Sequence, residues 1–135
     1  MRRAALITGS ATGVGAATAL ALARRGYDVL VNYSKSESEA RATEQACRQA
    51  GADTVLVRGD VADDDACRGL VEAAVRRWQR LDLLVNNAGV TTFSGANWEQ
   101  LGPETFQRIY AVNLVGPFQM VRAAAPHLKA ARGAV

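Results

Sequence analysis

The sequence has few of the residues that build disulfides, metal sites or membrane spans. It contains two cysteines, Cys47 and Cys67, and one histidine, His127, in 135 residues. Neither cysteine has metal-ligand spacing or a nearby partner, so we interpret both as buried or idle thiols and expect no metal site. No apolar run approaches the roughly 18 residues of a membrane span, and residues 1–3 lead directly into a strand rather than a signal peptide. The sequence therefore predicts a cytoplasmic protein without membrane contact.

An excess of one charge is lacking as well. Lys and Arg total 16, Asp and Glu total 13, and the formal net charge of +3 is spread along the chain with the two signs interspersed. Because no basic patch is formed, a nucleic-acid partner is not expected. A chain of this length with 49% hydrophobic and 21% charged residues is typical of one soluble globular domain.

The most informative stretch is residues 4–15, AALITGSATGVG, which joins an apolar strand to a glycine-rich turn and an alanine-rich helix. Gly9, Gly13 and Gly15 allow backbone N–H groups and the positive end of the helix dipole to face a phosphate. Their spacing is not the G-x-G-x-x-G fingerprint, and the turn lacks the Lys-Ser/Thr of a P-loop. Taken alone, this turn is as consistent with a plain tight connection as with a nucleotide site.

Strands and helices alternate along the whole chain. Apolar runs predict strands around residues 6–8 and at 28–33, 54–57 and 82–85, and helical spacing predicts helices at 14–25, between 34 and 51, at 63–78 and at 103–125. Each strand is apolar on both faces, which indicates a parallel sheet with right-handed crossovers. The predicted fold is therefore α/β, a doubly wound, Rossmann-like parallel sheet.

Prolines mark two points in the last predicted helix, and the chain ends in a short apolar segment. Gly116-Pro117 predicts a bend near Asn113, and Pro126 is expected to disturb the helix where it reaches Ala125. Residues 133–135 have the pattern of the first residues of a fifth strand. We therefore interpret the chain as a sheet of four strands and a long helix, cut where strand five begins.

Ligands of doubly wound sheets sit at the carboxyl ends of the strands, and the unusual residues of this sequence gather there. They are the glycine turn at 9–15, the polar segment at 32–35, Asp60-Val61, and the segment 86–89. The convergence of four separate segments on one edge favours a nucleotide site over a plain connection.

These motifs resemble the short-chain dehydrogenase/reductase family. The resemblance is carried by Thr8-Gly9-x-x-x-Gly13-x-Gly15, Asp60-Val61, Asn86-Asn87-Ala88-Gly89, and Asn113 within Tyr110-Ala-Val-Asn-Leu114, in the family's order and spacing. The resemblance covers essentially the whole chain, and the motifs are most similar to those of the acyl-carrier-protein ketoreductase type. The motifs do not separate that type from sugar, steroid or general carbonyl reductases.

The resemblance implies a role for each matching residue. The cofactor phosphates would be held by Gly9, Ser10, Thr12, Gly13, Val14 and Gly15; the adenine would contact Asp60 and Val61; and the ribose would be bordered by Asn86, Ala88 and Gly89. Asn113 would hold a water in the family's proton relay. From the residues alone, an Asn in a bent helix can release a backbone carbonyl to bind water, and the alternative is an Asn that merely satisfies itself.

The sequence departs from the family in its acid/base residues. The family uses a Ser after strand five and a Tyr-x-x-x-Lys on the next helix, but the three tyrosines, Tyr27, Tyr33 and Tyr110, are followed four residues later by Val, Glu and Leu. We therefore expect residues 1–135 to be one dinucleotide-binding domain, the cofactor-binding half of an oxidoreductase, and inactive alone. The resemblance implies a small-molecule carbonyl or alcohol substrate and a homo-oligomer, a dimer or tetramer, at full length. The alternative is a dinucleotide-binding or interaction module without catalysis.

The end of the second predicted strand indicates the cofactor. It contains Asn32, Tyr33, Ser34 and Lys35, with no acidic residue to bind the ribose hydroxyls of NAD and repel a 2′-phosphate. NADP(H) is therefore predicted over NAD(H).

Overall fold

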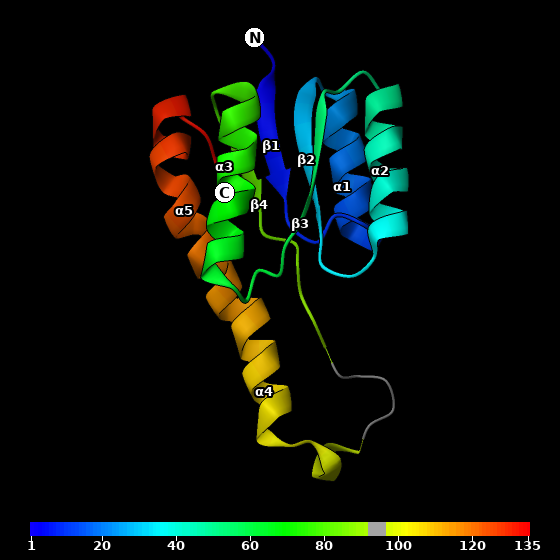
Figure 1. The fold of residues 1–135 in the computed structure, drawn as a ribbon, viewed down its shortest axis with the longest axis vertical. Helices are drawn as coiled ribbons and strands as arrows, with labels where there is room; N and C mark the ends of the chain where they lie inside the picture. Colours follow the sequence, from blue (N-terminus) through cyan, green and yellow to red (C-terminus); the bar gives the residue numbers. More distant parts are fainter. Residues whose placement is uncertain (92–96) are drawn as a thin grey trace.

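Four parallel strands form one sheet in the order β3-β2-β1-β4, between helices on both faces (Figure 1). The computed structural model describes residues 1–91 and 97–135. The strands are β1 (Arg3–Ile7), β2 (Tyr27–Tyr33), β3 (Thr54–Arg58) and β4 (Leu83–Val85). The predicted doubly wound α/β fold is confirmed.

The helices follow the strands in strict alternation through the first half of the chain. They are α1 (Gly13–Arg24), α2 (Glu37–Gln49), α3 (Asp64–Trp78), α4 (Pro103–Tyr110) and α5 (Gly116–Ala131), with a 3-10 turn η1 (Trp98–Gln100) before α4 and a π-helical turn η2 (Ala111–Val115) between α4 and α5. α1 and α2 pack on one face of the sheet, and α3 and α5 on the other.

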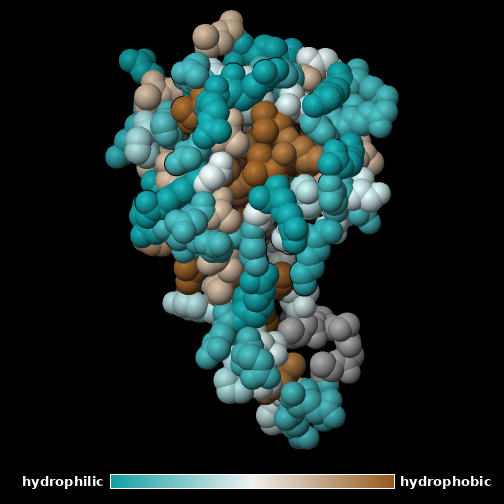
Figure 2. All heavy atoms as spheres, in the orientation of Figure 1, coloured by the Kyte–Doolittle hydropathy of each residue, from teal (hydrophilic) through white to brown (hydrophobic). Residues whose placement is uncertain are grey.

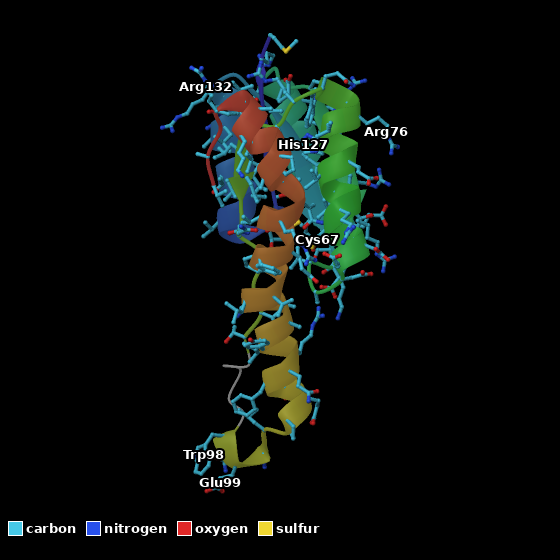
Figure 3. The ribbon with its side chains drawn as sticks, turned by 90° about the vertical axis from the view of Figure 1, so that its left-hand side faces the viewer. Cys67, Arg76, Trp98, Glu99, His127 and Arg132 are labelled. Atoms are coloured by element: carbon cyan, nitrogen blue, oxygen red, sulfur yellow. The ribbon has the colours of Figure 1, made fainter. Side chains whose placement is uncertain are left out.

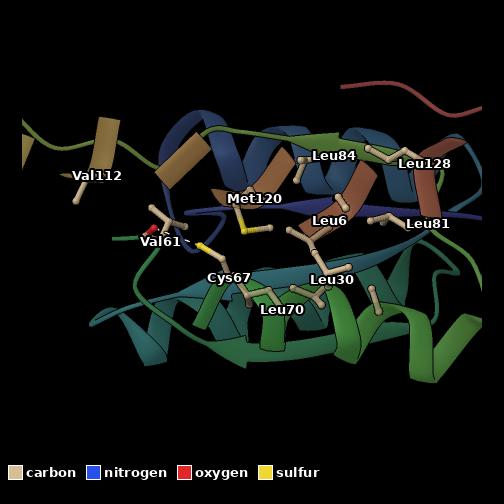
Figure 4. Packing of buried hydrophobic residues seen from close by; sticks show 13 residues of the cluster. Leu6, Leu30, Val61, Cys67, Leu70, Leu81, Leu84, Val112, Met120 and Leu128 are labelled. Atoms are coloured by element: carbon tan, nitrogen blue, oxygen red, sulfur yellow. Dashed lines mark hydrogen bonds between the residues drawn. The ribbon is translucent and has the colours of Figure 1, made fainter. Parts of the chain in front are cut away.

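Side chains alternate along each strand between two apolar clusters, as the period of a strand requires. Leu6, Leu30 and Leu84 are paired side by side in the register and point toward α3 and α5 (Figure 4). Their neighbours along the strands, such as Ile7 and Val31, are buried against α1 and α2. Because both faces are covered, the strands are apolar throughout.

The long helix is irregular near Pro117, as expected, but not at Pro126. The irregularity expected near Asn113 is the π-helical turn η2, in which the Gly116 N–H donates to the Ala111 carbonyl, and it joins α4 to α5. Pro126 was expected to disturb the helix, and this prediction is wrong, because α5 continues through it to Ala131. Ala124 and Leu128, on either side of Pro126, are buried in the core, so packing offsets the missing hydrogen bond.

α4 and η1 extend away from the body of the molecule, with Trp98 near the far end (Figures 1 and 3). Five large apolar side chains spaced about one turn apart are exposed along α4, η2 and α5; they are Phe106, Tyr110, Leu114, Phe118 and Val121, and we call them the apolar stripe. On the face seen in Figure 2 most of the surface is hydrophilic, with a hydrophobic area over the sheet beside α3. Within residues 1–91 and 97–135, no helix is both long enough and apolar enough to span a membrane.

The end of the chain returns to the sheet beside β4. The Leu84 N–H donates to the Ala134 carbonyl at 3.1 Å, and the Ala134 N–H donates to the Asp82 carbonyl at 2.9 Å. Leu83 and Ala134 thereby form one isolated parallel bridge. This pairing has the position and direction expected for the first residues of a fifth strand.

Carboxylates tie the elements together at the amino-terminal edge of the sheet. Asp82 accepts a hydrogen bond from the Ala4 N–H at 2.8 Å, and Asp28 accepts one from the Asp53 N–H at 2.9 Å. Asp28 also pairs with Arg2 at 2.7 Å. These contacts fix the starts of β1, β2 and β3 relative to β4.

Asp53 connects the start of β3 to the end of α3. Arg77 donates two hydrogen bonds to its carboxylate, at 2.7 and 2.8 Å, and the Trp78 indole N–H donates a third at 2.8 Å. The hydrogen bonds from Arg77, helped by Trp78 and opposed by burial, lower the pKa of Asp53 to about 2. Because this folded-state pKa lies below the ordinary value of 3.8, the ionised carboxylate stabilises the fold above about pH 4, and this stability is lost as the pH falls toward about 2.

Replacing Asp53 by Asn should lower the free energy of unfolding at pH 7 by about 1 kcal/mol, a value discounted because the carboxylate is 39% exposed. The difference from the wild type should shrink between about pH 4 and pH 2. Urea unfolding of the full-length gene product at several pH values measures it. Glu37→Gln, which removes the exposed Arg41–Glu37 pair within α2, is the control and should have a smaller effect. A difference that persists unchanged at pH 2 would contradict this assignment.

Candidate functional site

A cleft of about 350 Å³ lies at the carboxyl ends of the strands, where the sequence predicted a site. The last two residues of β2, segments that follow all four strands, and one residue each from α4 and η2 line it. These residues are Gly9, Ala11, Thr12, Asn32, Tyr33, Ser34, Lys35, Ser36, Gly59, Asp60, Val61, Asn87, Ala88, Gly89, Val90, Arg108 and Val112. The parallel register, in which Ile7 lies beside both Val31 and Val85, brings these segments to one edge.

Asn32 joins the ends of three strands from beneath the cleft. Its side chain is almost fully buried. The amide oxygen accepts the Gly9 N–H at 2.9 Å, and the amide nitrogen donates to the carbonyls of Val57 and Gly59 at 3.2 and 3.1 Å. The backbone N–H of Asn32 donates to the Ser10 hydroxyl at 2.9 Å. Asn32 therefore lines the cleft, while its polar side-chain atoms bind protein backbone.

Thr8 and Asn87 make a second connection, between the ends of β1 and β4. The Thr8 hydroxyl accepts the N–H groups of Asn87 and Ala88 at 3.1 and 3.0 Å. In return, the Asn87 amide donates to the carbonyls of Thr8 and Gly9 at 3.1 and 2.9 Å. The glycine turn is thus held in place by the segment that follows β4.

The glycine turn has the geometry of an anion cradle. Gly9 adopts a φ of +61°, and a Cβ there would lie only 2.8 Å from the Cα of Ala88. Gly13, at the first position of α1, adopts a φ of +58°, and a Cβ there would meet no atom of the described residues within 4 Å. Thr12 precedes the helix without capping it through its side chain, and the first turn has no acidic residue. The N-terminal N–H groups of α1 therefore suit a phosphate.

Asp60 is the acidic residue in the lining of the cleft, and both oxygens of its carboxylate have partners. One oxygen accepts the Ala62 N–H at 3.0 Å, and the other pairs with Arg108 of α4 at 2.8 Å. Burial raises the pKa of Asp60, but the hydrogen bonds from Ala62 and Arg108 and the nearby charge of Lys35 outweigh it, so the pKa is lowered. Asp60 is therefore ionised near neutral pH.

Asn113 lies in the π-helical turn and contacts the segment after β4. Its amide oxygen accepts the Val90 N–H at 2.8 Å, and its amide nitrogen donates to the Val90 carbonyl at 2.9 Å. Pro117 has no N–H to donate to the Asn113 carbonyl four residues earlier. The side chain is thus engaged with backbone, and the backbone carbonyl lacks the donor that a regular α-helix would provide.

The structure gathers most, but not all, of the predicted site residues in the cleft. Gly9, Thr12, Asn32, Tyr33, Ser34, Lys35, Asp60, Val61, Ala88 and Gly89 line it, whereas Ser10, Gly13, Val14, Gly15, Asn86 and Asn113 do not. The Ser10 hydroxyl is fully buried and donates to the Ile7 carbonyl at 2.7 Å. Gly15 packs against the Asn87 side chain. Ser10 and Gly15 thus support the turn from behind.

The side chains that sequence reasoning missed include Thr8, Asn87 and Arg108. Thr8 and Asn87 were recognised only as parts of motifs, although the adjacent pair Asn86-Asn87 showed that an inward-facing amide was available. Arg108 gave no signal, because a lone arginine on an amphipathic helix is normally a solvent-facing residue. Among residues 1–91 and 97–135 there is no cluster of three or more potential metal ligands.

Known proteins resemble this chain in sequence and in fold. The family model for short chain dehydrogenase matches residues 3–135. An uncharacterized oxidoreductase of Methylorubrum extorquens is 43% identical over 126 residues, which cover 93% of this chain and 50% of that protein. A trihydroxynaphthalene reductase of Colletotrichum orbiculare is 36% identical over 129 residues, covering 96% of this chain and 45% of the reductase.

The fold comparison agrees. A Burkholderia xenovorans protein solved as a short-chain dehydrogenase/reductase superposes with a TM-score of 0.91 at 42% identity, covering 96% of this chain and 53% of that one. The chain thus spans about half the length of the curated relatives it matches.

Replacing Thr8 by Val, which keeps the shape but removes the hydroxyl, should lower the free energy of unfolding by about 1–3 kcal/mol, because two backbone N–H groups lose their acceptor. Thr18→Val is the matched control: its hydroxyl donates to the Val14 carbonyl on an exposed helix face, and its loss should change stability by less than about 0.5 kcal/mol. Urea denaturation of both variants in the full-length gene product measures the difference. Equal losses would refute the role given to Thr8.

Proposed function

The chain belongs to the short-chain dehydrogenase family, and we propose that the whole protein is an NAD(P)(H)-dependent oxidoreductase that interconverts a carbonyl and an alcohol on a small molecule. The observation that carries the proposal is the cleft itself, where the glycine turn, the N-terminus of α1 and the segments after all four strands converge. The nicotinamide of the bound cofactor would supply or accept the hydride. The residues of this chain bind and orient that cofactor.

Each part of the cleft suits one part of a dinucleotide. Thr12 lines the cleft directly before α1, so the N-terminal N–H groups of that helix, which begins at Gly13, suit the phosphates. Asp60 and Val61, which follow β3, also line the cleft, and β2 with Asn32 lies between them and the glycine turn after β1. They are assigned to the adenine. Ala88 and Gly89 are assigned to the ribose, together with Asn86 beside them, as the sequence resemblance implies.

Asn113 is assigned the catalytic role that this half of the protein contributes. Its side chain is bonded to Val90, so the group proposed to hold a water is its backbone carbonyl, which Pro117 leaves without an α-helical donor. The Tyr-x-x-x-Lys pair does not occur in these 135 residues, so the reaction requires residues that this sequence does not contain. A reading frame that continues into a Ser and a Tyr-x-x-x-Lys supports the enzyme, and one that ends at Val135 favours a dinucleotide-binding module.

The apolar stripe supports the proposed homo-oligomer. Phe106, Tyr110 and Phe118 are each 60% or more exposed, and such a row of aromatic side chains is typical of a surface that another chain covers. The second half of the protein and a second subunit are the proposed neighbours of this helix.

NADP(H) is the proposed cofactor. Tyr33, the last residue of β2, and Ser34 and Lys35 after it line the cleft, and none of the three has a carboxylate that would repel a 2′-phosphate. We assign the selection of the cofactor to fewer residues than the sequence suggests. The side chain of Asn32 is buried and bonded to backbone, so selection is assigned to residues 33–35.

Replacing Ser34 by Asp together with Lys35 by Ala should shift the preference toward NAD(H). The new carboxylate would repel the 2′-phosphate, and the lost ammonium would no longer attract it, so we expect the ratio of the two dissociation constants to change by about tenfold or more. Fluorescence titration of the full-length gene product with NADPH and NADH measures it. Lys129→Ala, at the end of α5, is the control. An unchanged ratio would refute the assignment.

Replacing Gly13 by Val should abolish cofactor binding while the far-ultraviolet circular dichroism stays near that of the wild type. A Cβ added at this position meets no atom of the described residues within 4 Å. The main cost in the free protein is therefore that valine must adopt the φ of +58° that Gly13 has, which costs about 1–2 kcal/mol. The added side chain would occupy the space where a phosphate approaches backbone. Unchanged affinity for NADPH in the folded variant would show that the turn is only a connection.

A further inference from the structure

The two residues assigned to the adenine are fixed by side chains from the long helix. Asp60 and Val61 follow β3 after a single glycine, in a connection without regular structure before α3. The Asp60 carboxylate is 39% exposed and is paired at 2.8 Å with Arg108. Arg108 lies on α4 and itself lines the cleft.

Val61 is held by the segment of the same long helix on the other side of η2. Its carbonyl accepts hydrogen bonds from the buried Gln119 amide of α5 at 2.9 Å and from the Cys67 thiol at 3.2 Å; Figure 4 shows the second contact. α5 can approach because residue 116 is glycine: a Cβ there would lie 2.8 Å from a methyl carbon of Val61. The contacts to Asp60 and Val61 thus come from both sides of η2.

We propose that Arg108 and Gln119 are positioning residues that set the affinity for the adenine part of the cofactor, Arg108 by orienting the Asp60 carboxylate and Gln119 by fixing the Val61 backbone. This inference rests on the proposed function. It extends that function by giving α4 and α5, which carry part of the apolar stripe, a role in binding the cofactor. An ionised carboxylate accepts a hydrogen bond from the exocyclic amino group of adenine. Held by Ala62 and Arg108, the Asp60 carboxylate keeps one orientation toward that group.

The Arg108–Asp60 ion pair differs in its position from a second ion pair of the long helix. Arg122, on α5, makes a similar pair with Asp64 at 2.7 Å, but neither of these residues lines the cleft. Both pairs connect the long helix to the segment around the start of α3. Only the Arg108 pair includes a residue assigned to the cofactor, so the two pairs make a matched comparison.

The test uses the full-length gene product and three probes: NADPH, its hypoxanthine analogue, in which the exocyclic amino group is a carbonyl oxygen, and reduced nicotinamide mononucleotide, which has no adenine. Arg108→Gln should raise the dissociation constant for NADPH roughly fivefold and reduce the preference for NADPH over the hypoxanthine analogue. Affinity for the mononucleotide should not change. Arg108→Lys should restore part of the preference, and Gln119→Leu should weaken both dinucleotides to the same extent.

Arg122→Gln is the control and should leave all three dissociation constants as in the wild type. Circular dichroism confirms that each variant is folded, and Arg108→Lys with Gln119→Leu provides the same test if Arg108→Gln does not fold. Wild-type affinities for the two dinucleotides in the Arg108 and Gln119 variants would overturn the inference, as would an equal loss in Arg122→Gln. A wild-type protein that binds neither NADPH nor NADH would instead overturn the proposed function.

Discussion

Side-chain amides hold the carboxyl ends of the strands together, and the shape of the cleft depends on them. Asn32 joins the end of β2 to the glycine turn and to the backbone after β3, and Asn87 joins the same turn to the end of β4. An amide can donate and accept at once, so one buried side chain satisfies several backbone groups in a region where the sheet ladder has ended. Without these contacts, the polar backbone of the turns would be buried without partners.

The choice of polar residue differs between the two edges of the sheet, and electrostatics explains the difference. At the amino-terminal edge, Asp28, Asp53 and Asp82 take the structural roles and are neutralised by arginines. At the carboxyl edge the corresponding roles fall to Asn32 and Asn87, which carry no charge. A carboxylate at either position would neutralise part of the positive potential at the N-terminus of α1 and repel a phosphate. The neutral amides also donate to backbone carbonyls, which a carboxylate cannot do, and they add no negative charge that would repel an anionic ligand.

The sequence predicts the fold well because the spacing of apolar residues and the positions of glycines indicate where each strand and helix begins and ends. It locates the cleft for the same reason, since parallel strands bring their following segments to one edge. It could not show which of the adjacent residues Asn86 and Asn87 faces inward, because the alternation of a strand ends at that point. Asn32 was assigned to the cofactor, although its side chain turns under the cleft. Pro126 was expected to disturb a helix that tertiary packing maintains.

The π-helical turn divides the long helix into two segments whose side chains are offset in phase. A single turn of this kind contains one residue more than an α-helix needs, and each residue of an α-helix rotates the following side chains by about 100°. Removing one residue from Ala111–Val115 would restore α-helical spacing, apart from the hydrogen bond that Pro117 cannot donate. It would also rotate one segment against the other. The apolar stripe would then wind away from a single face, and Arg108 and Gly116 could no longer both face the segment that follows β3. The chain can therefore accept substitutions in this turn far more readily than a change in its length.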